Sequence, residues 1–107
     1  MSDAPVSISN WNACYNSNDG ILALSCRVTA DEGEATISGV GLILNDAGGK
    51  TIASMYVELA ENSSLASPAL NLPANGLAVG DTVLAAATGE AGGKHYFFEQ
   101  RLTIENC

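Results

Sequence analysis

Apolar residues along much of this chain alternate with polar ones at a period of two, the pattern of half-buried β-strands. The clearest example is ILALSCRVTA at residues 21–30, in which every second side chain is apolar and Arg27 falls on the polar face. The side chains expected to point inward from this segment are Leu22, Leu24, Cys26 and Val28. The alternation, bounded by turn residues, predicts a strand.

The same alternation recurs in segments that are separated by turn sequences such as NSNDG at 16–20 and NDAGGK at 45–50. The other segments expected to form strands are residues 4–11, 35–44, 51–59, 69–72, 81–89 and 94–104. Alternation in the first of these places Val6 and Ile8 on one face and Trp11 on the other. The expected core residues of the second are Val40, Leu42 and Leu44.

The run Ala85–Ala87 has a competing interpretation, because alanine favours helices. The segment is short, however, and it is bounded by Gly80 and Gly89. We therefore expect a strand, in which small residues leave room where two sheets come close together.

About seven short strands at regular spacing predict an all-β fold in which antiparallel sheets pack as a β-sandwich. A length of 107 residues fits one domain, so residues 1–107 are expected to form a single sandwich.

Three stretches resemble the fibronectin type III-like and immunoglobulin-like modules of bacterial surface and phage proteins. They are ATISGVGLIL with its Gly39-Val40 pair, LPANGLAVGDTVLAAATG, and the closing hairpin EAGGKHYFFEQRLTI. The resemblance implies an Ig/FN3-like sandwich of about seven strands that binds, spaces or assembles other molecules. The chain departs from the family at Val83, where those modules usually carry the aromatic residue of the tyrosine corner.

Charge restricts the classes of partner. The net charge is −8, and the four basic residues, Arg27, Lys50, Lys94 and Arg101, are too far apart in sequence to form a phosphate-binding stripe. Nucleic acid and anionic membrane surfaces are therefore not expected as partners, while a basic partner or a metal ion fits this charge. Since the chain has no run of about 18 apolar residues, it is not expected to insert into a membrane.

The three cysteines allow several arrangements. In a seven-stranded sandwich the first and last strands run roughly parallel, so Cys14 and Cys107, each placed after its strand, would meet at one pole. We expect a Cys14–Cys107 disulfide, with Cys26 as a small buried apolar residue. The alternatives are a Cys14–Cys26 bond, three free thiols in a reducing compartment, and an intermolecular bond from Cys107.

Candidate catalytic and metal-binding groups are few. His95 is the only histidine, and it is expected to be an exposed strand residue and not part of a catalytic triad. The oxygen-rich loops NSND, DEGE and ND could bind calcium if two of them met, but solvated turns are the simpler expectation. We expect no enzyme activity, no cofactor and no metal site.

Aromatic residues suggest a binding patch. In the HYFF sequence at 95–98, alternation turns Tyr96 and Phe98 inward and leaves Phe97 on the outer face beside His95. An outward Phe97 next to Trp11 or Tyr15 would form a patch of Trp11, Tyr15, Phe97 and His95. The alternative is that these aromatic residues pack in the core or at a sheet edge.

Together these features predict a non-catalytic structural or interaction module. It would belong to a virion, as a capsid-decorating or tail component, or to a secreted or cell-surface protein. A chain that begins at Met1 without a leader favours the virion. Its partner would be a protein, further copies of itself or a glycan. The alternatives are a carbohydrate- or ligand-binding domain and a small acidic protein of the inhibitor or immunity type. The expected location is extracellular, on a cell surface or in a virion.

Overall fold

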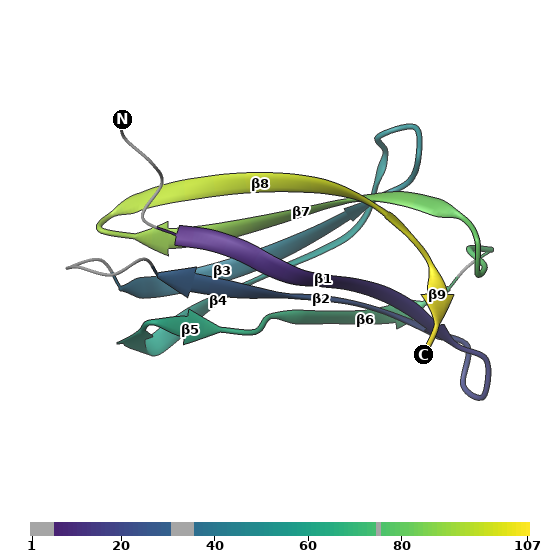
Figure 1. Cartoon of the computed structure of the whole chain (residues 1–107), viewed down its shortest axis with the longest axis horizontal. Helices are drawn as coiled ribbons and strands as arrows, with labels where there is room; N and C mark the ends of the chain where they lie inside the picture. Colours follow the sequence, from purple (N-terminus) through teal and green to yellow (C-terminus); the bar gives the residue numbers. More distant parts are fainter. Residues whose placement is uncertain (1–5, 31–35, 75) are drawn as a thin grey trace.

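The computed structural model describes residues 6–30, 36–74 and 76–107, and within these ranges the chain consists of β-strands joined by turns (Figure 1). The all-β prediction is confirmed. The strands are β1 (Val6–Asn16), β2 (Ile21–Ala30), β3 (Ile37–Asn45), β4 (Thr51–Ser63), β5 (Leu65–Ala66), β6 (Ala69–Pro73), β7 (Thr82–Ala91), β8 (Lys94–Thr103) and β9 (Glu105–Asn106).

The strands form two sheets that pack face to face (Figure 1). Sheet 1 has the order β5-β2-β1-β9, and β6 also pairs with β2. Sheet 2 has the order β4-β3-β7-β8. Every pairing is antiparallel except that of β1 with β9, which is parallel. The predicted sandwich is therefore present, with short β5, β6 and β9 in addition to the longer strands.

Alternating apolar side chains of β2, β3 and β7 fill the space between the sheets. All the core residues predicted for 21–30 and 35–44 are buried, namely Leu22, Leu24, Cys26, Val28, Val40, Leu42 and Leu44. No polar or charged side chain among the described residues is buried. Burial raises the pKa of the Cys26 thiol to about 11, so this cysteine is protonated and a weak nucleophile at neutral pH.

The alanine run lies in strand β7, so the helical alternative is wrong. Ala85 and Ala87 belong to the core between the sheets, while Ala86 is buried outside that core. A Cβ placed on Gly89, further along β7, would lie 3.2 Å from Val28 Cγ1. Small residues in β7 therefore allow the two sheets to approach closely.

A bulge in β1 corrects the predicted orientation of Trp11. Ser9 pairs with Arg27 but Asn12 pairs with Ser25, so β1 holds one extra residue between these pairs. Asn10 adopts a positive φ of 56° there, a conformation that asparagine tolerates better than most residues. After the bulge the alternation is inverted, and Trp11 packs against the core instead of pointing away from it.

The chain ends by crossing from sheet 2 to sheet 1. Ile104 is buried directly after β8, and β9 then pairs with β1, opposite Cys14 and Tyr15. Cys107 donates a backbone hydrogen bond to the Tyr15 carbonyl at 3.1 Å and forms a disulfide with Cys14. The predicted Cys14–Cys107 pairing is confirmed, with Cys26 free and buried. Cys14 itself lies within β1 and not after it, because β1 continues to Asn16.

Removing the disulfide should lower the free energy of unfolding by about 4 kcal/mol, because the bond closes a loop that spans 93 residues. The test compares Cys14→Ser/Cys107→Ser with its parent by urea denaturation, both carrying Cys26→Ala so that no free thiol can exchange. A loss below about 1 kcal/mol would show that the β1–β9 pairing holds the chain end without the bond.

Candidate functional site

The outer face of sheet 2 is hollowed along its middle. Pairing across the sheet aligns Tyr56 of β4, Gly41 of β3, Thr88 of β7 and Phe97 of β8 in one row. The two inner strands thus contribute a glycine and a threonine, while the two edge strands contribute aromatic rings. A face that has small residues between large ones is concave.

A cleft of about 530 Å³ occupies this hollow, within the usual size range of small-ligand pockets. Its lining residues are Gly41, Leu42, Ile43, Ser54, Met55, Tyr56, Thr88 and His95. The lining is therefore mainly apolar, with hydroxyl, phenol and imidazole groups at its margin.

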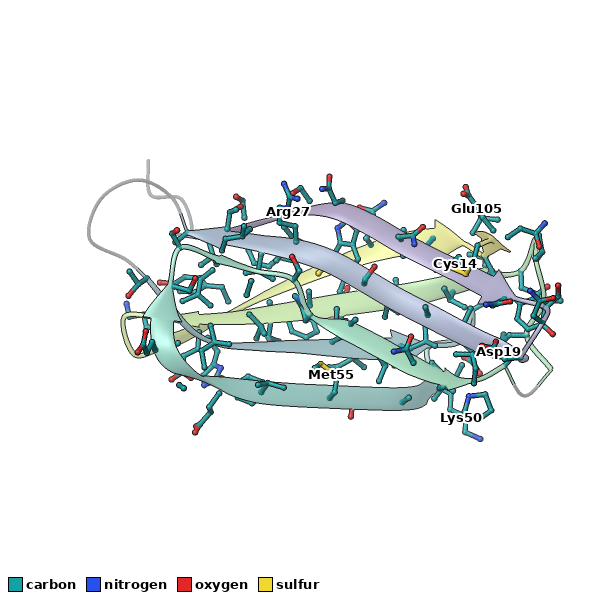
Figure 2. All side chains as sticks on the ribbon, turned by 90° about the horizontal axis from the view of Figure 1, so that it is seen from below. Cys14, Asp19, Arg27, Lys50, Met55 and Glu105 are labelled. Atoms are coloured by element: carbon teal, nitrogen blue, oxygen red, sulfur yellow. A yellow bond between two sulfur atoms is a disulfide. The ribbon has the colours of Figure 1, made fainter. Side chains whose placement is uncertain are left out.

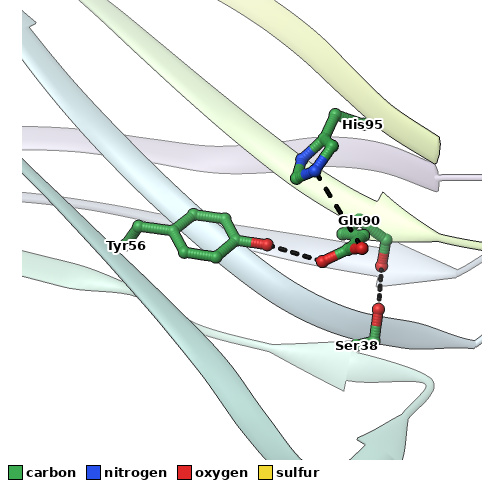
Figure 3. A network of polar contacts seen from close by, with 4 residues as sticks. All are labelled: Ser38, Tyr56, Glu90 and His95. Atoms are coloured by element: carbon green, nitrogen blue, oxygen red, sulfur yellow. Dashed lines mark hydrogen bonds and ion pairs between the residues drawn. The ribbon is translucent and has the colours of Figure 1, made fainter. Parts of the chain in front are cut away.

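The ring of Tyr56 extends across β3, where only glycine leaves room for it (Figure 3). A Cβ added to Gly39 would collide with the phenol oxygen of Tyr56, and one added to Gly41 would lie 2.9 Å from Tyr56 Cδ1. An aromatic residue that covers glycines of a neighbouring strand is a recurrent way to stabilise a sheet. Gly39 and Gly41 therefore decide where the Tyr56 ring lies.

Glu90 is the centre of a polar network on this face (Figure 3). The Tyr56 hydroxyl donates a hydrogen bond of 2.8 Å to Glu90 Oε1, and the Ser38 hydroxyl donates to the Glu90 backbone carbonyl at 3.2 Å. His95 Nε2 lies 4.0 Å from Glu90 Oε2, and the His95 and Tyr56 ring centroids are 6.0 Å apart. The network joins all four strands of sheet 2.

The environment of Tyr56 holds its phenol in the neutral form. Partial burial, the hydrogen bond to Glu90 and the negative charges of Glu90 and Glu58 raise the pKa of Tyr56 to about 12. The phenol therefore stays protonated, and can donate its hydrogen bond, throughout the physiological pH range.

The four residues predicted to form a binding patch lie in two places. His95 and Phe97 lie on the outer face of β8, where Phe97 is 56% exposed. Trp11 and Tyr15 are half-buried and pack against the core. Trp11 also lines a second cleft, together with Arg101 and Glu105. The structure thus brings His95 and Phe97 to the hollow face and places Trp11 elsewhere.

Tyr56 and Glu90 are site residues that the sequence analysis did not single out. The strand pattern held a usable signal, since alternation in MYVEL puts Tyr56 and Glu58 on the same face. Their position opposite Gly39 and Gly41 depends on strand pairing, which local alternation does not determine.

The acidic loops considered for calcium use their side chains locally. Asn16 Oδ1 accepts from the Asn18 amide, and Asp46 Oδ1 accepts from the amides of Gly48 and Lys50. Figure 2 shows Asp19 and Lys50 toward the same end of the sandwich as Cys14. The DEGE segment at 31–34 lies outside the described residues. Across the described parts of the chain, no group of three or more His, Cys, Asp or Glu residues could hold a metal ion.

Neither a scan against protein-family models nor a search of curated proteins gives a match to this chain. In the ranges that the structure describes, no helix has the length and apolar character needed to cross a bilayer.

Replacing Gly39 by alanine should destabilise the fold by about 1–3 kcal/mol, because the new methyl group collides with the Tyr56 phenol. The same substitution should cost much less in a Tyr56→Ala background, since all its closest neighbours are side-chain atoms of Tyr56 and Glu90. Denaturation of the four proteins of this double-mutant cycle measures the coupling.

Gly41→Ala is the matched control for this cycle. Its methyl group would also meet the Met55 carbonyl at 2.9 Å and Thr88 Oγ1 at 2.8 Å, so the loss of Tyr56 should not relieve it. If Tyr56→Ala reduced the destabilisation equally for Gly39→Ala and Gly41→Ala, the placement of the Tyr56 ring would be contradicted.

Glu90→Gln should lower the pKa of Tyr56 from about 12 toward the ordinary value of about 10, because it removes a nearby negative charge. Because the pKa of Tyr56 is higher in the folded than in the unfolded state, the neutral phenol contributes stability below about pH 10. This contribution is lost as the pH rises from about 10 to about 12. Tyrosinate absorbance, recorded as a function of pH for both proteins, measures the change in the pKa of Tyr56. Glu99→Gln removes an equal charge from β8 and should leave the pKa of Tyr56 nearly unchanged.

Proposed function

We propose that this chain is a non-catalytic interaction module with an Ig/FN3-like fold, and that it binds a protein partner through the outer face of sheet 2. Such a module would serve in a virion, as a capsid-decorating or tail component, or in a secreted or cell-surface protein. The carrying observation is the exposure of aromatic side chains around a preformed hollow on that face.

The order of strand pairing supports the resemblance to fibronectin type III modules. In constant-type immunoglobulin domains the fourth strand belongs to the same sheet as the first and second strands. Here β4 pairs with β3, while the short strands β5 and β6 take the remaining edge beside β2. A four-stranded sheet in the order β4-β3-β7-β8, facing a sheet built mainly from β1, β2 and the short strands beside β2, supports the resemblance to fibronectin type III modules.

The exposed aromatic residues support a binding role for the face. Tyr56 is 44% exposed and Phe97 is 56% exposed, and both lie in the same row across sheet 2. Tyrosine is enriched among the residues that contribute most to protein interfaces, since its ring buries a large area with few rotatable bonds. The cleft beside Tyr56 would accept a side chain of the partner.

The polar groups of this face support binding and not chemistry. The Ser38 hydroxyl donates to a backbone carbonyl and the Tyr56 hydroxyl donates to a carboxylate, so both act in holding the strands together. Groups used in this way preorganise a surface, which lowers the entropic cost of binding.

The disulfide supports the proposed location. Disulfides persist mainly in oxidising environments such as the cell exterior, the periplasm and the surfaces of virions. The Cys14–Cys107 bond is therefore compatible with a secreted, surface or virion protein.

A random peptide library displayed on phage provides the test. Peptides are selected on the wild-type protein, and their affinities are then measured for the variant Tyr56→Ser/Phe97→Ser and for a control variant. The control is Leu65→Ser, in which a side chain of similar exposure (46%) is removed from sheet 1. Most selected peptides should lose more than about tenfold in affinity for the first variant and keep their affinity for the second.

Retention of binding by both variants would contradict the proposed function, because the interaction surface would then lie elsewhere. Circular dichroism and thermal denaturation of each variant establish that lost binding does not reflect unfolding. Both variants replace exposed side chains, so a native spectrum is expected. The loss of the Tyr56 ring over Gly39 and Gly41 should lower the melting temperature of the first variant, so binding is measured well below that temperature.

A further inference from the structure

We propose that the cleft on the outer face of sheet 2 takes the side chain of a lysine or arginine from a basic protein partner. The cation would pair with the Glu90 carboxylate, which is not itself a lining residue but lies against two that are, Tyr56 and His95. The aliphatic stem of the side chain would lie along the apolar floor beside Gly41 and Ile43. The inference rests on the proposed function and names the partner chemistry of that same surface.

The Glu90 carboxylate is half-buried and still has capacity to accept hydrogen bonds. Its side chain is 26% exposed, and Oε1 accepts from the Tyr56 hydroxyl at 2.8 Å. Oε2 lies 4.0 Å from His95 Nε2, which is too far for a hydrogen bond. A partly desolvated carboxylate gains most from a cation that both pairs with its charge and donates hydrogen bonds.

The described part of the chain does not supply that cation itself. The one ion pair among the described residues is His95 with Glu90, and a histidine is charged only when protonated. Arg27 lies on β2 in the other sheet, Lys50 ends the β3–β4 turn, and Arg101 lies four residues beyond Phe97 on β8. Lys94 begins β8 opposite Ala91, where alternation places it on the other strand face from His95, and it forms no ion pair with Glu90. Glu90 therefore has no lysine or arginine partner within the described residues, and we infer that another molecule supplies one.

The walls of the cleft, like the carboxylate, suit a lysine or arginine side chain. Tyr56 and His95 flank the Glu90 carboxylate from two sides, with ring centroids 6.0 Å apart (Figure 3). A cation beside a tyrosine ring is attracted by its π electrons. The methylene groups of the same side chain can bury against apolar surface while the charged end reaches the carboxylate.

The charge of the protein favours a basic partner over a second copy of the chain. The net charge is −8, so two copies repel each other, whereas a basic partner is attracted from a distance. Two carboxylates lie near Tyr56 at this face: Glu90 accepts its hydrogen bond, and Glu58 is two residues along β4 on the same face.

The experiment titrates the folded protein with an acetylated Gly-Ser-Lys-Ser-Gly amide and follows backbone amides by NMR. The same peptide with arginine is the second ligand, and the peptide with norleucine, which keeps the stem and lacks the charge, is the control ligand. We expect saturable shifts at Gly41 and Thr88 with lysine or arginine, no saturation with norleucine, and weaker binding at high salt.

Two protein variants locate the cation. Glu90→Gln should weaken binding by about tenfold or more, because a charge-assisted hydrogen bond is lost while the glutamine oxygen can still accept from Tyr56. Glu99→Gln, which removes an equal charge from the neighbouring strand β8, should change the affinity by less than about twofold. Ser54→Lys, at the exposed margin of the cleft, should abolish binding and provides a second test if Glu90→Gln does not fold.

Four results would overturn the inference. The first is equal binding of the norleucine peptide, and the second is an equal effect of Glu90→Gln and Glu99→Gln, which would indicate general attraction by a negative surface. The third is stronger saturation of the same amides by a neutral disaccharide, cellobiose, which would assign the cleft to a glycan. If library peptides bind this face without carrying lysine or arginine, the inference fails while the proposed function stands.

Discussion

The structure depends on small residues on both faces of the two central strands of sheet 2. On the inner face, Ala85, Ala87 and Gly89 of β7 let sheet 1 approach so closely that a single added methyl group would meet Val28. On the outer face, Gly39 and Gly41 of β3 leave the space that the Tyr56 ring covers. One constraint on side-chain volume therefore determines both the spacing of the sandwich and the shape of the candidate site.

Glu90 connects this architecture to a function. Its backbone carbonyl accepts from Ser38 of β3 and its carboxylate accepts from Tyr56 of β4, so one residue of β7 ties three neighbouring strands together. The carboxylate keeps an oxygen that faces His95 of β8 at 4.0 Å, too far for a hydrogen bond. A group that stabilises the sheet and keeps a partly exposed oxygen is the basis of the proposed preference of this surface for basic ligands, which requires no loop to move.

Local alternation predicted most of the fold because each of the long strands buries one face. A period of two identifies the buried side chains of β2 without knowledge of their neighbours, and the positions of Cys14 and Cys107 follow from the course of the first and last strands. The orientation of Trp11 was predicted wrongly because one extra residue at Asn10 inverts the alternation in β1. A bulge is stabilised by the partner strand and by a tolerated positive φ, and a polar asparagine within a strand is a weak signal of it.

The amino-acid sequence by itself determined the class of fold, most of the inward residues and the excess of negative charge, because these follow from local periodicity and composition. It favoured the Cys14–Cys107 disulfide over its alternatives through the expected course of the chain, and the structure decided between them. Tertiary structure alone decided the candidate site. Tyr56, Glu90 and His95 come from three strands, and only the register of β3 with β4 and β7 places the Tyr56 ring over glycines and its hydroxyl against Glu90. Register is set by pairing across the sheet, where a shift of one residue would turn each of these side chains to the opposite face.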